Sequence, residues 1–322
     1  IRSCGMVPGL WLEIEVMGVN CPLASQVPDD WYFMRHGKRV YDRSRYQLDF
    51  RNPQVRAHAT EVIDRVVNEY GVGYIKMDYN IEPGIGTELD ADSYGDGLLG
   101  HNRAYLEWLD GIFEKYPDLI IENCSSGGLR MDYAMLSRYS IQSTSDQEDY
   151  VRYATITANA PSAVTPEQAA VWSYPLTDGD CEEVIFNMVN ALLLRIHQSG
   201  HLVNLSPERF GYVKEAISYY KTIRHLTKKA LPYWPLGLSS YNDPWVSLGL
   251  EAEGKDFLAV WRRDSQSPVQ EIPVKHLKGK EVEAVCAYPQ SAECGFHWNK
   301  EAGTLTVELP ERVSARIFEL RY

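Results

Sequence analysis

The chain has 322 residues, enough for one large domain and a smaller one, so neither a disulfide nor a metal ion is needed to stabilise it. Its formal net charge of −12 and its pI near 5.2 argue against a nucleic-acid or anionic-membrane partner. Either partner would need a basic surface, and the Lys and Arg residues are dispersed. A neutral small-molecule substrate fits this composition better.

Cysteine usage indicates a reducing environment. No two of the six cysteines form a C-x-x-C pair, and no His lies close enough in sequence to indicate a zinc site. We therefore predict free thiols and a cytoplasmic protein. The six are Cys4, Cys21, Cys124, Cys181, Cys286 and Cys294.

Neither a membrane span nor a signal peptide is recognisable. No apolar stretch approaches the roughly 18 residues expected of a membrane span. The first residues, IRSCGMVPGL, do not resemble a signal peptide. Because the chain begins at Ile1 without an initiator Met, we expect it to be the remainder of a longer protein.

The first half of the chain alternates between predicted strands and helices. An amphipathic helix is predicted over residues 52–70, with Asn52 as N-cap, Pro53 at the first helical position and Gly71 at the end. A second helix is predicted over residues 102–116. Buried strands are predicted at residues 9–16, 72–78, 119–124 and 140–146.

The alternation continues less clearly after residue 146, through an apolar segment at 156–164, a helix near 182–197, a segment at 200–206 and a long helix opened by Ser206 and Pro207. Repeated βα units with near-continuous apolar strands indicate a parallel sheet. Roughly 230 residues of such units favour a (β/α) barrel over an open sheet. No G-x-G-x-x-G follows a strand, which argues against a dinucleotide fold.

From about Pro232 the pattern changes to short alternating strands separated by Gly, Pro, Asp or Asn. We predict a (β/α) barrel domain over residues 1–231, incomplete at its N-terminus and reduced to about six βα units. An antiparallel β-sandwich is predicted over residues 232–322.

Polar residues end the strand in YIKMDYN, residues 74–80. Because side chains alternate along a strand, Lys76, Asp78 and Asn80 are predicted to point together into the barrel mouth, where the active sites of such barrels lie. The alternative is a solvated loop start, or a Lys76 that merely neutralises Asp78. Other polar strand ends are Glu13, Glu15, the segment 122–124 and Asp146.

A second carboxylate at Asp146 makes a catalytic interpretation possible. It begins the acidic run DQED, and crowding with Glu148 and Asp149 would raise one carboxylic pKa. Two carboxyl groups across a pocket are what glycoside hydrolysis requires. The alternative for Asp146 is a helix N-cap, with Glu148 and Asp149 in the first turn.

The segment CSSGGLRMD, residues 124–132, is a third candidate element. Gly127 and Gly128 directly after a strand allow the backbone to approach a ligand closely. The alternative is an ordinary tight βα turn, with Arg130 in a surface ion pair.

Taken together, these segments resemble the α-galactosidases of glycoside hydrolase family 36. That family carries a strand ending K-x-D-x-N, then C-x-S-G-G-x-R-x-D and S-D-x-x-D, which correspond here to residues 76–80, 124–132 and 145–149. GLWLEIE (9–15) and SRYQLDFRNPQVR (44–56) are similar to two further family segments. The similarity covers nearly the whole chain.

The resemblance implies a retaining hydrolase in which Asp78 is the nucleophile and Asp146 the general acid/base, with their carboxyl groups about 5–6 Å apart. It implies no metal or organic cofactor. The remaining implied roles concern the sugar: Lys76 and Asn80 bind hydroxyls, Trp11 and Arg45 line the pocket, and Cys124 and Gly127 face the C2 side.

Three departures from the family pattern are visible. The two adjacent aspartates of the first barrel strand and the preceding β-sandwich are absent, so the pocket is expected to be incomplete and the polypeptide alone inactive. Ser143 stands where many members place a Trp, which opens one wall of the pocket and leaves the leaving-group preference undefined. Ile14 replaces a Pro, a smaller change.

These observations predict an α-galactosidase that acts on a small oligosaccharide such as those of the raffinose series. The parent protein is expected to be a homo-oligomer. An α-N-acetylgalactosaminidase of the same family is the first alternative. It must admit an acetamido group at C2, and Cys124 with its small following loop favours the unmodified hydroxyl. The second alternative is an inactive carbohydrate-binding fragment.

Overall fold

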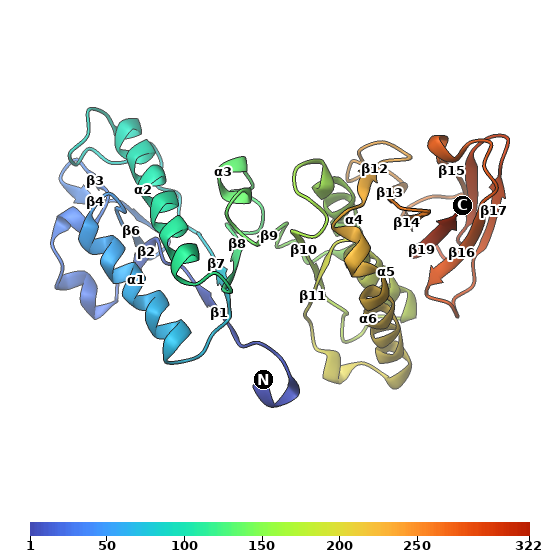
Figure 1. The fold of residues 1–322 in the computed structure, drawn as a ribbon, viewed down its shortest axis with the longest axis horizontal. Coiled ribbons are helices and arrows are strands. Elements are labelled where there is room, and N and C mark those ends of the chain that lie inside the picture. The colour runs from blue at the N-terminus through green and yellow to red at the C-terminus, as the bar shows by residue number, and fades with distance from the viewer. The chain divides into compact units, whose positions relative to one another are not determined.

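The computed structural model describes residues 1–322, which divide into two compact units, Ile1–Ser143 and Thr144–Tyr322. Unit 1 contains four parallel strands in the order β1-β7-β8-β9 (Figure 1). These are β1 (Gly9–Leu12), β7 (Tyr74–Met77), β8 (Ile120–Asn123) and β9 (Ile141–Ser143). Its helices are α1 (Pro53–Asn68), α2 (Tyr94–Lys115) and α3 (Tyr133–Leu136).

A long excursion separates β1 from α1 in unit 1. It forms two small antiparallel sheets, ordered β2-β6-β5 and β3-β4. The strands are β2 (Val16–Gly18), β3 (Met34–Arg35), β4 (Lys38–Arg39), β5 (Tyr41–Asp42) and β6 (Arg45–Gln47). Single 3-10 turns cover Arg2–Cys4, Pro22–Ser25 and Asp29–Trp31.

Helix α1 forms as its sequence predicts. The side chain of Asn52 accepts a hydrogen bond from the Gln54 backbone N–H at 2.8 Å, and Pro53 occupies the first helical position. Gly71 follows the helix at φ +67°, a conformation that favours glycine. The apolar side of α1 is buried in one core with α2 and the sheet, through Val55, Ala59, Ile63 and Val66.

Unit 2 begins with a parallel strand pair and three helices. The strands are β10 (Ala169–Ser173) and β11 (Arg195–Gln198), and the helices are α4 (Tyr150–Asn159), α5 (Cys181–Leu192) and α6 (Pro207–Thr227). Short 3-10 turns cover Ala160–Ser162 and Leu202–Asn204. As predicted, Ser206 caps α6, accepting a hydrogen bond from the backbone of Arg209, and Pro207 is its first residue.

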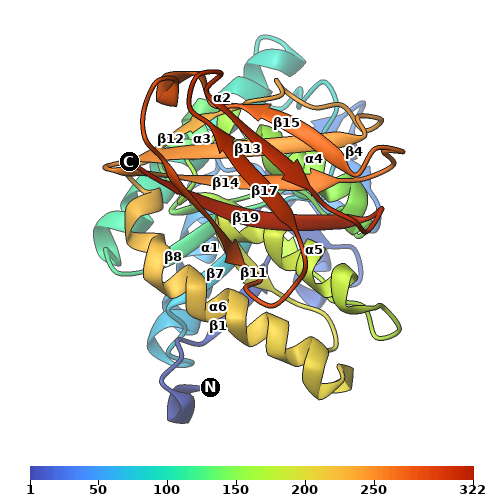
Figure 2. The same cartoon turned by 90° about the vertical axis from the view of Figure 1, so that its right-hand side faces the viewer.

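The rest of unit 2 consists of two antiparallel sheets, ordered β12-β13-β14-β19-β16 and β15-β18-β17. Figure 2 looks onto them. Both sheets contribute to one apolar core, including Leu258 and Phe318 of the first and Leu305 and Val307 of the second. The strands are β12 (Leu231–Tyr233), β13 (Trp245–Ala252), β14 (Lys255–Arg262), β15 (Val269–Pro273), β16 (Glu283–Tyr288), β17 (Gly295–Asn299), β18 (Thr304–Glu308) and β19 (Ser314–Arg321), with a 3-10 turn at Lys275–Leu277.

The predicted fold class is confirmed: six parallel strands, four in unit 1 and two in unit 2, precede antiparallel sheets. Several element boundaries were wrong. The strand predicted at 9–16 ends at Leu12, and the helix predicted from 102 begins at Tyr94, because Ser93 caps it by accepting a hydrogen bond from the Asp96 backbone.

The apolar segment 156–164 begins in helix α4, which ends at Asn159 and which Asp149 caps by accepting hydrogen bonds from the backbones of Val151 and Arg152, and it continues as the 3-10 turn Ala160–Ser162. The strand of this repeat is β10 instead. The end of the helix predicted over 182–197 is strand β11, and the segment 200–206 contains only the 3-10 turn.

Candidate active site

The parallel register of unit 1 aligns polar and aromatic residues on one face of its sheet. Trp11 of β1 lies opposite Lys76 of β7, and Lys76 lies opposite Glu122 of β8. Alternate residues point to the same face, so Asp78 and Cys124 follow on that face just beyond the strand ends. In a parallel βα sheet this is the edge at which ligands bind.

The opposite face of the same strands is apolar. Ile75, Met77 and Ile121 are buried in the core that α1 and α2 cover. The predicted alternation of YIKMDYN is therefore confirmed as far as Met77, where β7 ends.

Asp78 has both carboxylate oxygens engaged. The Trp11 indole Nε1–H donates to Oδ2 at 2.9 Å, and the backbone N–H of Tyr79 donates to Oδ1, also at 2.9 Å. Asn80 and the Cys124 thiol also hydrogen-bond to this carboxylate. Asp78 is only 7% exposed, so the solvated-loop alternative does not describe it.

These contacts decide the charge state of Asp78. Burial by itself would raise its pKa, because the charged form loses hydration. The hydrogen bonds from Trp11, Asn80, the Tyr79 backbone and Cys124 outweigh burial, and the net pKa lies below the ordinary aspartate value. Asp78 is thus a buried, oriented and ionised carboxylate.

Asn80 links Asp78 to the loop that follows β8. Its side-chain oxygen accepts hydrogen bonds from the backbone N–H of Ser126 at 3.1 Å and from the Ser126 hydroxyl at 2.8 Å. This leaves its amide group to donate to Asp78. Ser126 and Gly127 have φ of +43° and +85°, so the backbone turns sharply here, and Gly127 suits that conformation.

Cys124 is a neutral thiol at the centre of this group. Burial raises its pKa to about 12, and the charge of Lys76 opposes that shift without cancelling it. The backbone of Gly127 hydrogen-bonds to its sulfur. The structure therefore brings together Trp11, Lys76, Asp78, Asn80, Cys124 and Gly127, six of the predicted site residues.

Arg45 lies on β6 and is paired with Glu13, Nε to Oε2 at 2.8 Å. The second oxygen of Glu13, Oε1, is buried without a hydrogen-bond partner. Sequence reasoning placed Glu13 only at a strand end. The spacing of Glu13, two residues after Trp11, could have indicated a place in the site, because alternate residues of a strand point to the same side.

Behind Asp78 lies a buried charge network that the sequence did not reveal. The Arg130 guanidinium donates to Glu15 at 2.6 Å and lies 4.2 Å from the centre of the Tyr79 ring. His101 Nδ1 accepts from the backbone N–H of Phe50, so its Nε2–H is the donor to Glu15, at 3.2 Å. The predicted surface pair of Arg130 was wrong, because Glu15 is 2% exposed.

Asp146, in unit 2, follows β9 and is exposed. The N-cap of α4 is Asp149 and not Asp146. The alternative in which Asp146 caps a helix was therefore wrong, and its carboxylate is left accessible to solvent.

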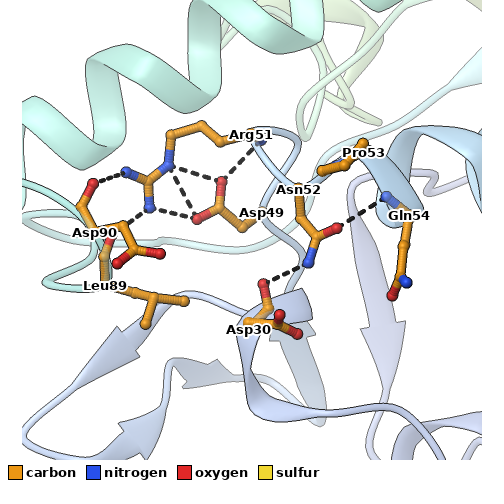
Figure 3. Close-up of a pocket in the computed structure, with 8 residues that line it drawn as sticks. All are labelled: Asp30, Asp49, Arg51, Asn52, Pro53, Gln54, Leu89 and Asp90. Carbon is orange, nitrogen blue, oxygen red and sulfur yellow. Dashed lines mark hydrogen bonds and ion pairs between the residues drawn. The ribbon is translucent and has the colours of Figure 1, made fainter.

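A separate pocket of about 490 Å³ opens beside the start of α1 (Figure 3). Its Arg51 guanidinium donates to Asp49 at 2.6 Å, to the Leu89 carbonyl at 2.7 Å and to the Asp90 carbonyl at 3.1 Å. These acceptors occupy the guanidinium, whose charge Asp49 balances, and the carboxylates of Asp30 and Asp90 also line the pocket.

No three or more His, Cys, Asp or Glu side chains are grouped in a way that could hold a metal ion. None of the helices combines the length and apolar character needed to cross a membrane.

Comparison with known proteins shows the family to which this chain belongs. The family model described as Melibiase matches residues 1–228. The chain belongs to the melibiase family. The match includes every residue of the candidate site described above.

Curated relatives of this melibiase-family chain are α-galactosidases. It is 25% identical over 253 residues to α-galactosidase Mel36A of Lactobacillus acidophilus, covering 76% of this chain and 34% of the relative. It is 24% identical over 314 residues to α-galactosidase AgaA of Geobacillus stearothermophilus, covering 89% and 41%. The chain thus spans 34% and 41% of the lengths of these two relatives.

Solved structures show the same fold. A family 36 α-galactosidase AgaA variant from Geobacillus stearothermophilus, in complex with raffinose, has a TM-score of 0.82 at 18% identity. The galactosidase domain of the α-galactosidase–sucrose kinase AgaSK has a TM-score of 0.82 at 20% identity. Both matches cover 99% of this chain, and they cover 45% and 44% of the solved chains.

Proposed function

We propose that the protein is a retaining α-galactosidase in which Asp78 is the nucleophile and Asp146 the general acid/base. The observation that supports this most strongly is the Asp78 carboxylate, which is buried, held through both oxygens and kept ionised. A nucleophilic carboxylate needs these properties, because it must be charged and aimed before the substrate arrives.

The proposed reaction has two steps. Asp78 attacks the anomeric carbon while Asp146 protonates the departing glycosidic oxygen, which forms a β-galactosyl ester on Asp78. Asp146 then removes a proton from water, which attacks the ester and releases α-galactose. The exposure of Asp146 suits this second role, since it must exchange protons with solvent and admit water.

The neighbouring residues would bind the sugar and orient the nucleophile. The side chains of Trp11 and Asn80 each donate a hydrogen bond to the Asp78 carboxylate. They would therefore orient the nucleophile as well as line the pocket. We propose that Lys76 and Arg45 bind hydroxyl oxygens, and that the unpartnered Oε1 of Glu13 accepts a hydrogen bond from a hydroxyl.

The C2 side of the pocket is assigned to the loop after β8. Cys124 is fully buried and Gly127 carries no side chain, so this wall is closely packed around the thiol. We propose that it fits a C2 hydroxyl and not an acetamido group. Preferential cleavage of a nitrophenyl α-N-acetylgalactosaminide would contradict this assignment.

The substrate class proposed is the terminal α-galactoside of small oligosaccharides. Variants of α-galactosidase AgaA from Geobacillus stearothermophilus have been solved in complex with raffinose and with stachyose. We also propose that residues 1–231 form the catalytic part and residues 232–322 a supporting sandwich.

Azide rescue of variants of the full-length natural protein tests the two carboxylate roles separately. Asp78→Gly should lose almost all activity, and azide should restore turnover to give β-galactosyl azide, because azide replaces the missing nucleophile. Asp146→Gly should instead give α-galactosyl azide, formed by attack on the Asp78 ester. The same azide anomer from both variants, or full activity of either without azide, would overturn the assignment.

A further inference from the structure

A pocket of about 460 Å³ lies in unit 2 at the carboxyl ends of strands β10 and β11. Its lining includes residues 174–177, which follow β10, and residues 199–201, which follow β11. We call these segments the β10 wall and the β11 wall. Parallel βα sheets bind ligands at this edge, and the volume lies within the range of about 300–1,000 Å³ that is typical of small-molecule sites.

The pocket adjoins the proposed general acid. Its lining also includes Glu148, from the loop before α4. Asp146 stands two residues earlier, so the Cα atoms of the two residues can be at most about 7 Å apart. The general acid of a glycosidase protonates the oxygen of the leaving group, so the leaving group lies on the same side as the acid. Glu148 marks only the position of the pocket, because the proposed contacts come from the two walls.

A buried ion pair holds the β10 wall in one conformation. Glu183 of α5 and Arg209 of α6 are 4% and 7% exposed, and they are paired at 2.9 Å. Glu183 accepts a hydrogen bond from the backbone N–H of Leu176 at 3.0 Å. Arg209 donates to the carbonyl of Leu176 and, at 2.8 Å, to that of Thr177. The wall is thus formed before a ligand arrives, as is usual for small-molecule sites.

The β11 wall is fixed against the β10 wall through its backbone. The N–H of Ser199 donates to the carbonyl of Ser173, the last residue of β10, at 2.9 Å. Gly200 has a φ of +79°, and a Cβ at this position would lie 2.9 Å from the carbonyl oxygen of Pro175. A glycine is therefore needed for the two walls to approach this closely.

The pocket offers both an aromatic surface and hydroxyl groups. Tyr174 lines it and stacks on Trp172, with the ring centres 5.8 Å apart and the planes at 23°. Trp172 in turn meets the ring of His197 edge-on at 5.0 Å. The hydroxyl groups of Thr177 and Ser199 make no hydrogen bond within the protein. A sugar ring matches this combination, because it presents C–H groups on its faces and hydroxyls at its edge.

We propose that this pocket binds the leaving group of the substrate and favours a polyhydroxylated ring, such as the next sugar of an oligosaccharide. The inference rests on the proposed glycosidase function and adds the place of the substrate beyond the cleaved bond. Tyr174 contacts a face of that ring, and Thr177 and Ser199 bind its hydroxyls. These residues thus determine which galactosides are cleaved well, and they take no part in the chemical step.

Two substrates that share galactose separate this site from the rest of the active site. The leaving group of raffinose is a disaccharide, whereas that of α-galactosyl fluoride is a single ion, which is too small to contact the walls. In the full-length natural protein, Thr177→Val should lower the ratio of kcat/KM for raffinose to that for the fluoride by about 2- to 10-fold, the loss of one hydrogen bond. The loss should appear mainly as a higher KM for raffinose, because the contact exists before and during bond cleavage.

Tyr174→Ala removes the aromatic surface and should lower the same ratio by about 10-fold or more. Thr222→Val is the matched control, because it removes a hydroxyl that is exposed on α6 outside the pocket, and it should keep the ratio of the unaltered protein. Circular dichroism should show that each variant is folded.

The outcomes separate this inference from the function on which it rests. If the fluoride is hydrolysed and the ratio is unchanged in Thr177→Val and Tyr174→Ala, the leaving-group site is overturned and the proposed function stands. If the unaltered full-length protein does not hydrolyse the fluoride, the proposed function is overturned and the leaving-group site with it.

Discussion

At the scale of single residues, Asp78 shows how opposing effects set a charge state. Its burial favours the neutral acid, and four hydrogen-bond donors favour the carboxylate and prevail. Cys124, beside it, shows the reverse outcome, because burial raises its pKa to about 12 and nothing nearby compensates fully. The two neighbours are consequently an ion and a neutral thiol at the same pH.

Removing one donor should shift the acid side of the pH profile. Trp11→Phe deletes the hydrogen bond to Asp78, so the pKa of Asp78 should rise, by about one to two units for a bond to a charged group. Activity requires the ionised form and is lost as pH falls through this pKa. The acid limb of kcat/KM should therefore move to higher pH.

The control for this shift is Tyr70→Phe, which changes an aromatic residue exposed at the end of α1. Its pH profile should match that of the unaltered protein. An acid limb that stays in place in Trp11→Phe would show that the indole does not tune the nucleophile.

The acid role of Asp146 should appear as a dependence on the leaving group. In Asp146→Ala, a nitrophenyl galactoside should lose much less activity than raffinose, since a good leaving group needs little protonation. Glu148→Gln, two residues away and also exposed, should show no such difference. Equal losses on both substrates in Asp146→Ala would argue against the acid role.

At the scale of elements, the strands of unit 1 are held in place by a buried ion pair as well as by apolar packing. Glu15 follows β1 and Arg130 follows β8, and the two meet under the Tyr79 ring. Burial would raise the pKa of Glu15, and Arg130 and His101 together lower it below the ordinary value. A buried pair of this kind is costly to break, because the remaining charge is left uncompensated.

Glu15→Gln should therefore destabilise the fold by about 3 kcal/mol or more, measured as the urea unfolding midpoint. Glu82→Gln is the matched control, because this carboxylate is 82% exposed in its pair with Arg43 and should change stability by less than about 1 kcal/mol. Similar midpoints for the two variants would contradict the importance of the buried pair.

The same pair predicts a pH dependence of stability. Because the pKa of Glu15 is lower in the folded protein, its contribution is present above its unfolded pKa and is lost as pH falls through the folded value. The unfolding free energy of the unaltered protein should thus fall more steeply in acid than that of Glu15→Gln. Parallel pH profiles would be inconsistent with this linkage.

At the scale of the whole molecule, local signals in the sequence predicted much of the fold. The cap at Asn52, the start of α6 at Ser206 and the short alternating strands after about Pro232 all depend on short-range patterns, and all were found. The segment 156–164 was left without an assigned structure because its apolar residues fit either a helix or a strand, and the cap at Asp149, seven residues earlier, places its first residues in helix α4.

The sequence predicted only those site residues that are grouped by their spacing along one strand. Lys76, Asp78 and Asn80 share a strand and its end, so alternation grouped Lys76 with Asp78 correctly. The partner of Arg130 lies 115 residues away, and no local pattern pairs the two. Long-range polar contacts of this kind follow from the packing of the folded chain.

The central claim is that Asp78 forms the covalent bond to the sugar. A fluorinated α-galactosyl fluoride, which forms the enzyme ester quickly and hydrolyses slowly, should inactivate the full-length protein. Mass mapping should then find one galactosyl label on the peptide containing Asp78 and none in Asp78→Ala. A label on another carboxylate, or hydrolysis of an ordinary substrate that releases β-galactose first, would contradict the account.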